Sequence, residues 1–195
     1  MTAPRALDIL MTDLLDNAIA LWKRDKMVAT VSWAFGPRKS AFAQPYDREG
    51  WDVSMEARVG LHAMVAACVD AEYIGRIDET WVKAQEKGTP PLVHGELQQM
   101  ADYDPEVKTA LCVQAYHLPT GRGYLYMASL ELFEDGSDHW VRTYSDDPDG
   151  RIVTGSELTA RVIPVLNDGP PLTPDVVEQF LNALHWTVVV SEVDA

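Results

Sequence analysis

The stretch TALCVQAYHLPTGRGYLYMASLELFEDGSDHWVRTYS, residues 109–145, decides the fold class of this chain. It contains three runs rich in β-branched and aromatic residues, separated by the turn sequences PTGR and EDGS. Gly121 and Gly136 supply the positive φ that tight hairpin turns require. A fourth short run, RIVTG, follows the acidic turn DDPDG. The spacing predicts a four-stranded antiparallel meander over about residues 109–155.

Helices and further strands flank the meander. Apolar residues recur at helical spacing in two segments before it, and Thr173 followed by Pro174 marks the start of a third helix after it. The segment 156–167 fits an edge strand or a broken helix equally well, because Pro164 falls inside its apolar run. The expected helices before the meander are 4–24 and 52–71, and the expected strands outside it are 27–35, 39–47, 71–85 and 186–193. We therefore expect a single globular α+β domain over residues 1–195, with a mainly antiparallel sheet and two or three helices packed on one face.

Asp78 and Glu79 are adjacent acids in the middle of the expected strand 71–85. Successive side chains of a strand point to opposite faces of the sheet. These two carboxylates are therefore not expected to share a substrate as a general acid and base.

The composition is strongly acidic, with 30 acidic and 16 basic residues and a net charge of −14. We find no basic cluster, so direct binding of nucleic acid is not expected. The longest apolar run, VGLHAMVAACV, is too short to cross a bilayer, and the first residues do not resemble a secretory signal. We expect a soluble cytoplasmic protein without membrane association, in which Cys68 and Cys112 are buried and reduced.

The acidic turn SDDPDGRIVTGSE is the nearest approach to a metal motif. Asp147 and Asp149 fall at the third and fifth positions of a calcium loop, but its twelfth position is Ser156 and the required Glu157 comes one residue late. A hairpin turn that happens to be acidic is the favoured interpretation. Asp147 and Asp149 remain weak metal candidates, and no cofactor is expected.

Other catalytic motifs are incomplete. His94 and Glu96 match the H-x-E of the zinc deaminases, but the downstream P-C-x-x-C is missing. The chain also lacks H-E-x-x-H, the phosphate-binding loop, G-x-G-x-x-G and the G-x-S-x-G elbow. His62 lies on the apolar stripe of the helix 52–71 and is interpreted as a core residue.

The best remaining catalytic candidates lie in the meander. His117, Glu131 and His139 could share one face across neighbouring strands and form a small polar site. Alternation of polar and apolar residues is also what the solvated face of an antiparallel sheet shows. This second interpretation is favoured, and the three residues are kept as candidates for the alternative.

The central block, DAEYIGRIDETWVKA followed by DPEVKTALCVQAYHLPTGRGYLYMASLELFEDG, resembles small proteins of bacteria and their phages to which no function is assigned. In these proteins a strand that ends in an acid and Trp is followed by a DP-containing turn and a hairpin. The resemblance covers about residues 70–135. It implies an accessory protein rather than a central metabolic enzyme, and it implies no activity, cofactor or catalytic residue.

Three functions follow as hypotheses. The leading one is a non-catalytic, acidic accessory module that binds another protein through its meander or at a free sheet edge. The second is a small metal-assisted hydrolase that uses His117, Glu131 and His139. The third is an inhibitor that mimics DNA with its carboxylates and occupies a nucleic-acid enzyme. The sequence does not predict an oligomeric state.

Overall fold

The computed structural model describes residues 4–51, 53–83, 99–132, 138–147, 155–168 and 173–192. Its helices are α1 (Arg5–Asp25), α2 (Met55–Val69), α4 (Gly155–Asp168) and α5 (Pro174–Leu184), with a short 3₁₀ turn η1 (Arg48–Trp51). Its strands are β1 (Val31–Phe35), β2 (Lys39–Pro45), β3 (Tyr73–Val82), β4 (Lys108–His117), β5 (Gly123–Leu132), β6 (Asp138–Asp147) and β7 (Trp186–Glu192).

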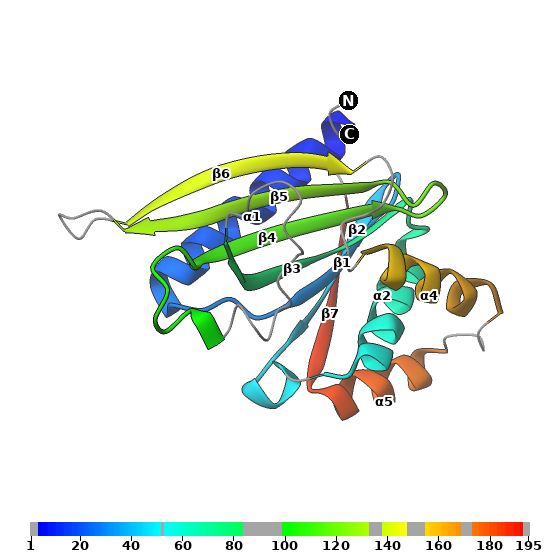
Figure 1. The fold of residues 1–195 in the computed structure, drawn as a ribbon. Coiled ribbons are helices and arrows are strands. Elements are labelled where there is room, and N and C mark those ends of the chain that lie inside the picture. Colours follow the sequence, from blue (N-terminus) through cyan, green and yellow to red (C-terminus); the bar gives the residue numbers. More distant parts are fainter. Residues whose placement is uncertain are drawn as a thin grey trace.

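The seven strands form one antiparallel sheet in the order β6-β5-β4-β3-β1-β2-β7 (Figure 1). Strands β3 to β6 follow one another along the chain and across the sheet. The hairpin of β1 and β2 lies beside β3, and β7 pairs with β2. Among the described strands, β6 and β7 therefore lie at the two edges.

The expected class, an α+β protein with a mainly antiparallel sheet, is confirmed, but the meander is composed differently. Its fourth strand is β3, which pairs with β4 along ten residues. Residues 151–154 of the expected last strand lie outside the described residues, and Gly155 begins α4. The unassigned segment 156–167 is helical and carries Pro164 inside α4.

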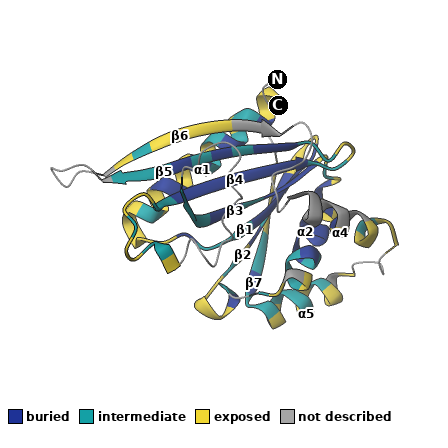
Figure 2. Cartoon of the chain, viewed as in Figure 1, coloured by how far each residue is buried: buried dark blue, intermediate teal, exposed yellow. Residues whose placement is uncertain are grey.

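The helices cover both faces of the sheet, which corrects the expectation of one covered face. Helix α1 lies against one face, under β3, β4 and β5, while α2, α4 and α5 group on the other (Figure 1). We call these the α1 face and the α2 face. Figure 2 shows that β4 in the middle of the sheet is largely buried and that β3 is buried or half-buried, whereas β6 is largely exposed where it is described.

Strand β1 explains why both faces need cover. Trp33 and Phe35 point toward α1, and Ala34 between them points toward α2, and all three are buried. A strand with apolar residues on both sides is stable only between two layers.

Helix α1 begins at Arg5 and buries its apolar stripe of Leu7, Met11, Leu15 and Ala18 against the sheet. Helices α2 and α5 start at caps whose hydroxyl accepts a backbone N–H, Ser54 from Ala57 at 3.2 Å and Thr173 from Val176 at 3.5 Å. No helix among the described residues is both long and apolar enough to cross a bilayer.

Candidate interaction edge

The three meander residues considered as a catalytic site do not converge. His117 ends β4 on the α1 face, where its ring centroid lies 4.9 Å from that of Tyr73 and its Nδ1 lies 2.8 Å from the Thr120 hydroxyl. Glu131 and His139 are direct partners across β5 and β6, at the other end of the meander and on the α2 face. The structure therefore brings Glu131 and His139 together without His117.

Glu131 is held by a cation. Its Oε1 lies 2.6 Å from Nζ of Lys108 on β4, and both side chains are partly exposed. It also lines a cleft of about 590 Å³ that residues 101–105 help to form. Within the described part of the chain, no group of three His, Cys, Asp or Glu residues is placed to hold a metal ion.

The acidic turn gives no calcium loop in the described residues. Asp147 is the last residue of β6 and pairs with Gly123, while Asp149 lies outside the described residues. Ser156 and Glu157, at the end of the proposed loop, belong to α4. These two residues stand at the start of α4, where a calcium loop would place its bidentate acid, and the turn itself, residues 148–154, lies outside the described residues.

His62 is a core residue, as the sequence predicts. Its Nε2 lies 2.9 Å from the carbonyl oxygen of Gly75 and its Nδ1 lies 2.8 Å from that of Arg58. Burial lowers the pKa of His62 and outweighs the opposing effect of the two carbonyls. The buried ring therefore lies between α2 and β3 and is not accessible from solvent.

Asp78 and Glu79 lie on opposite faces of β3, as predicted. Asp78 points to the α2 face, where its Oδ2 lies 2.5 Å from Nε of Arg76 and its Oδ1 accepts from the Thr30 hydroxyl at 3.2 Å. The same Arg76 Nε donates to Gln114 at 3.3 Å. Asp78 is almost fully buried, so this ion pair belongs to the interior of the layer.

Glu79 points to the α1 face and fixes the end of α1. Its Oε1 accepts from the indole N–H of Trp22 at 3.1 Å, and its Oε2 accepts from the backbone N–H of Val28 at 2.9 Å. Both carboxylates are therefore committed to structural contacts.

The two edges of the sheet differ in how they are protected. Three side chains of β6 contact the rest of the α1 face. Trp140 stacks edge-on against Trp22 at 5.2 Å, Tyr144 against Tyr126 at 4.7 Å, and Arg142 pairs with Asp16 of α1. A charged residue in mid-strand is also a common means of blocking edge-to-edge pairing.

Strand β7 has no such protection from the described residues. Its central residues, TVVVS at 187–191, carry no charge, and Val189 and Val190 are 50% and 45% exposed. These two side chains point to opposite faces of the sheet. An uncharged, apolar edge strand offers a row of backbone N–H and C=O groups to an added strand.

An apolar cleft lies on the α1 face, between α1 and the strands β1 and β2. It measures about 230 Å³. Leu14 and Leu21 of α1 form one wall, and Val31 and Phe42 of the sheet lie opposite. Phe42 is the direct partner of Val189, so the cleft and the exposed side chain of β7 belong to one continuous surface. None of the described residues that line the cleft is charged.

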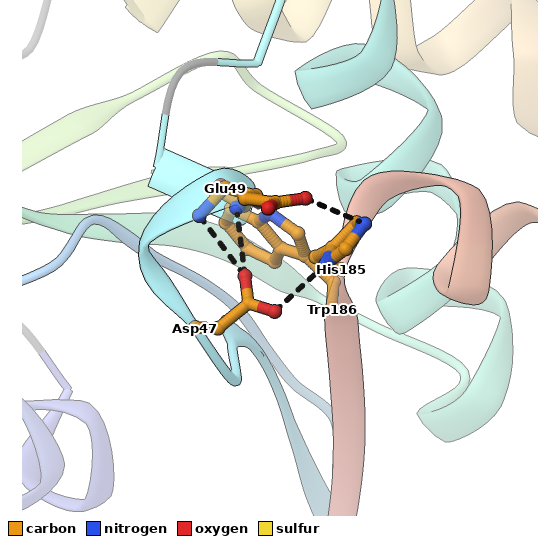
Figure 3. Close-up of polar contacts among 5 residues, drawn as sticks. Asp47, Glu49, His185 and Trp186 are labelled. Carbon is orange, nitrogen blue, oxygen red and sulfur yellow. Dashed lines mark hydrogen bonds and ion pairs between the residues drawn. The ribbon is translucent and has the colours of Figure 1, made fainter.

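A cluster of polar contacts fixes the start of β7 (Figure 3). His185 Nδ1 lies 2.8 Å from Asp47 Oδ2, and its Nε2 lies 3.3 Å from Glu49 Oε2. The hydrogen bond to Asp47 raises the pKa of His185, and the same bond lowers the pKa of Asp47. Trp186 is buried and donates from its indole N–H to the carbonyl oxygen of Gly50 at 2.6 Å. The strand is therefore anchored at its start and exposed along its centre.

The sequence pattern predicted the strand 186–193 but not its position at the edge. An uncharged run of β-formers was the available signal, yet it fits a central strand equally well. Asp47 and His185 lie 138 positions apart in the chain, and no motif links them.

No family model, curated protein or solved structure matches this chain in the comparisons with known proteins. Its function is therefore inferred from its own geometry.

Proposed function

We propose that this chain is a non-catalytic accessory module that acts by pairing its free β7 edge with a strand of another polypeptide. One observation carries the proposal: β7 is an edge strand with an uncharged centre, and its adjacent Val189 and Val190 are each about half exposed. Natural sheets usually block such an edge with charges, Pro, bulges or a covering element.

Strand addition supplies both backbone and side-chain contacts. The added strand receives main-chain hydrogen bonds from β7, and its alternate side chains face the two layers. On the α1 face they would lie beside Val189 and the cleft floored by Phe42. Burial of this apolar surface favours binding by roughly 25 cal/mol per Å² before the entropy of association is subtracted.

A small metal-assisted hydrolase is the second candidate, because Glu131 and His139 are direct cross-strand partners and Glu131 lines a cleft. It is less well supported, since Glu131 already pairs with Lys108. It requires zinc or manganese at a stoichiometric level in protein purified without chelator. Elemental analysis that finds neither metal would contradict it.

The binding proposal is tested with a synthetic strand as the probe. The peptide Lys-Thr-Val-Thr-Val-Thr-Lys, acetylated and amidated, alternates apolar and polar residues and carries charge opposite to that of the chain. We expect it to slow hydrogen exchange of the backbone amides of 187–191 at low protein concentration. The same peptide with alternate N-methylated amides cannot complete the ladder and should have no effect.

Two matched variants locate the site. Val189→Lys places a charge at the centre of β7 and should abolish the protection, whereas Val141→Lys on β6 changes a similarly exposed valine, 43% exposed, on the opposite edge and should leave it intact. Protection that survives Val189→Lys, or that appears at β6 instead, would overturn the proposal.

A further inference from the structure

The centre of β7 is nearly the same when read in either direction. Its sequence is Thr187-Val188-Val189-Val190-Ser191, with Val189 in the middle. Pairing this segment with an antiparallel copy of itself about Val189 places valine opposite valine and Thr187 opposite Ser191. Such pairs are favourable in antiparallel sheets, because β-branched side chains pack together and hydroxyl side chains hydrogen-bond across strands.

A two-fold axis produces this alignment. In a symmetric dimer the same surface is used by both copies, so it must be complementary to itself. The axis stands perpendicular to the sheet and passes beside Val189 at the outer edge of β7. Rotation about it pairs the two β7 strands antiparallel. It also leaves the α1 faces of the two copies on the same side of the joined sheet. Phe42 and Val189 lie side by side on the α1 face, in adjacent strands. The apolar surface that these two residues form in one copy therefore adjoins the same surface in the other copy.

The charges at the ends of β7 favour the same direction. At the start of the strand lie Asp47 and the 78%-exposed Glu49. At its other end Lys39 is half exposed, and its ammonium lies 3.8 Å from Glu192. Antiparallel pairing places the Lys39–Glu192 ion pair of one copy opposite the acidic start of β7 in the other, whereas parallel pairing would bring the two acidic starts together. The charges therefore select direction and do not add affinity.

We propose that the strand paired at β7 is the β7 of a second copy of this chain, so that the two sheets join into one continuous sheet across a two-fold axis at Val189. This inference rests on the proposed function, because it names the partner for the same edge. Seven-residue strands meeting at an edge bury less surface than a standard protein interface, so the dimer is weak and concentration-dependent.

The net charge adds a distinguishing property. Each copy carries −14, and two like-charged molecules repel at long range. Salt screens this repulsion more effectively than it weakens the short-range strand contacts. The dimer should therefore become stronger as salt rises from low to physiological concentration, which is opposite to the behaviour of a complex between oppositely charged partners.

Sedimentation equilibrium over a concentration series tests the dimer directly. We expect the mass to rise from that of one chain, 21.7 kDa, toward twice that value. Val189→Lys places two ammonium groups opposite each other at the axis and should weaken the dimer at least about tenfold. Val141→Lys adds the same charge at the β6 edge and should leave the dimer unchanged. Circular dichroism confirms that both variants are folded.

Cross-linking tests the register. In a Cys68→Ser background, Val189→Cys should oxidise to a covalent dimer, because the two sulfur-bearing residues lie directly opposite each other. Thr187→Cys alone should not cross-link, since its copies lie four positions apart along the paired strands. A mixture of Thr187→Cys and Ser191→Cys should do so.

A chain that stays monomeric at all concentrations and salt levels overturns this inference, and so does a dimer that Val189→Lys does not weaken. The proposed function is judged separately by the synthetic strand. Protection of the β7 amides by the peptide in a monomeric chain would keep the edge as a binding site for a foreign strand. Absence of both the dimer and the protection would remove the two proposals together.

Discussion

The backbone of Gly75 lies directly against the indole ring of Trp33. A Cβ atom at Gly75 would lie 2.3 Å from Cζ2 of Trp33 and 2.1 Å from the backbone oxygen of Gln114. Neither neighbour can move freely, because Trp33 is fully buried and Gln114 belongs to the central strand β4. Gly75→Ala should therefore lower the free energy of unfolding by at least about 2 kcal/mol, measured by urea denaturation.

The same substitution at Gly60 provides the control. A Cβ there would meet Cζ of Phe180 at 2.8 Å, at the edge of a ring that is only partly buried. Alanine is also favoured over glycine by about 1 kcal/mol inside a helix such as α2. We expect Gly60→Ala to change stability by less than about 1 kcal/mol. Equal losses at the two glycines would contradict this account of β3.

Glu79 joins the end of α1 to β3, and its removal should be costly. Glu79→Ala takes the acceptors away from the Trp22 indole and from the backbone N–H of the buried Val28. An unsatisfied buried donor costs about 1–3 kcal/mol, and we expect a loss of that size in thermal or urea unfolding. Glu72→Ala, at an exposed position just before the same strand, should change stability little. A smaller loss for Glu79→Ala than for Glu72→Ala would show that the contact has no energetic importance.

Much of the sheet could be predicted because its signals are local. Alternating β-formers and glycine turns marked β4, β5 and β6, and a helical stripe marked α1. The place of the hairpin β1–β2 between β3 and β7 depends on contacts between segments far apart in the chain, for which the sequence carries no local signal. The second helical layer was signalled by β1, whose VSWAF run carries small or apolar residues on both faces.

The candidate site was predicted less well, for two different reasons. The separation of His117 from Glu131 follows from hairpin register. His117 borders the turn between β4 and β5, whereas Glu131 lies near the other end of β5, beside the turn to β6. A strand of ten residues spans about 33 Å, so this part could have been predicted. The exposure of Val189 could not, because whether a strand lies at the edge depends on the whole sheet.

The two cysteines should react very differently. The sequence suggested that both are buried, but Cys68 is exposed on α2 and only Cys112 is buried in β4. Burial raises the pKa of Cys112 to about 12 and also raises that of Cys68. A thiol reagent at mildly alkaline pH should therefore label one thiol in the folded chain and two in denaturant. Cys68→Ser should remove the fast-reacting thiol, and two fast thiols in the folded chain would contradict the burial of Cys112.

The contact of His185 with Asp47 should make the anchoring of β7 depend on pH. The pKa of His185 is raised from 6.5, so its stabilising effect is complete below that value and is lost as pH rises through the raised pKa. The pKa of Asp47 is lowered from 3.8, so the stabilisation that Asp47 contributes is present above pH 3.8 and is lost as pH falls through the lowered pKa.

The variant His185→Asn tests this dependence, because Asn tolerates the left-handed backbone at φ 58. Its Tm should fall furthest below that of the unmodified chain between about pH 4 and pH 6.5, and the gap should narrow toward pH 9. Adding His185→Asn to Asp47→Asn should produce a smaller further pH dependence, because of the two acids beside His185 only Glu49 then remains. A difference in Tm between the unmodified chain and His185→Asn that grows as pH rises would contradict the ion pair.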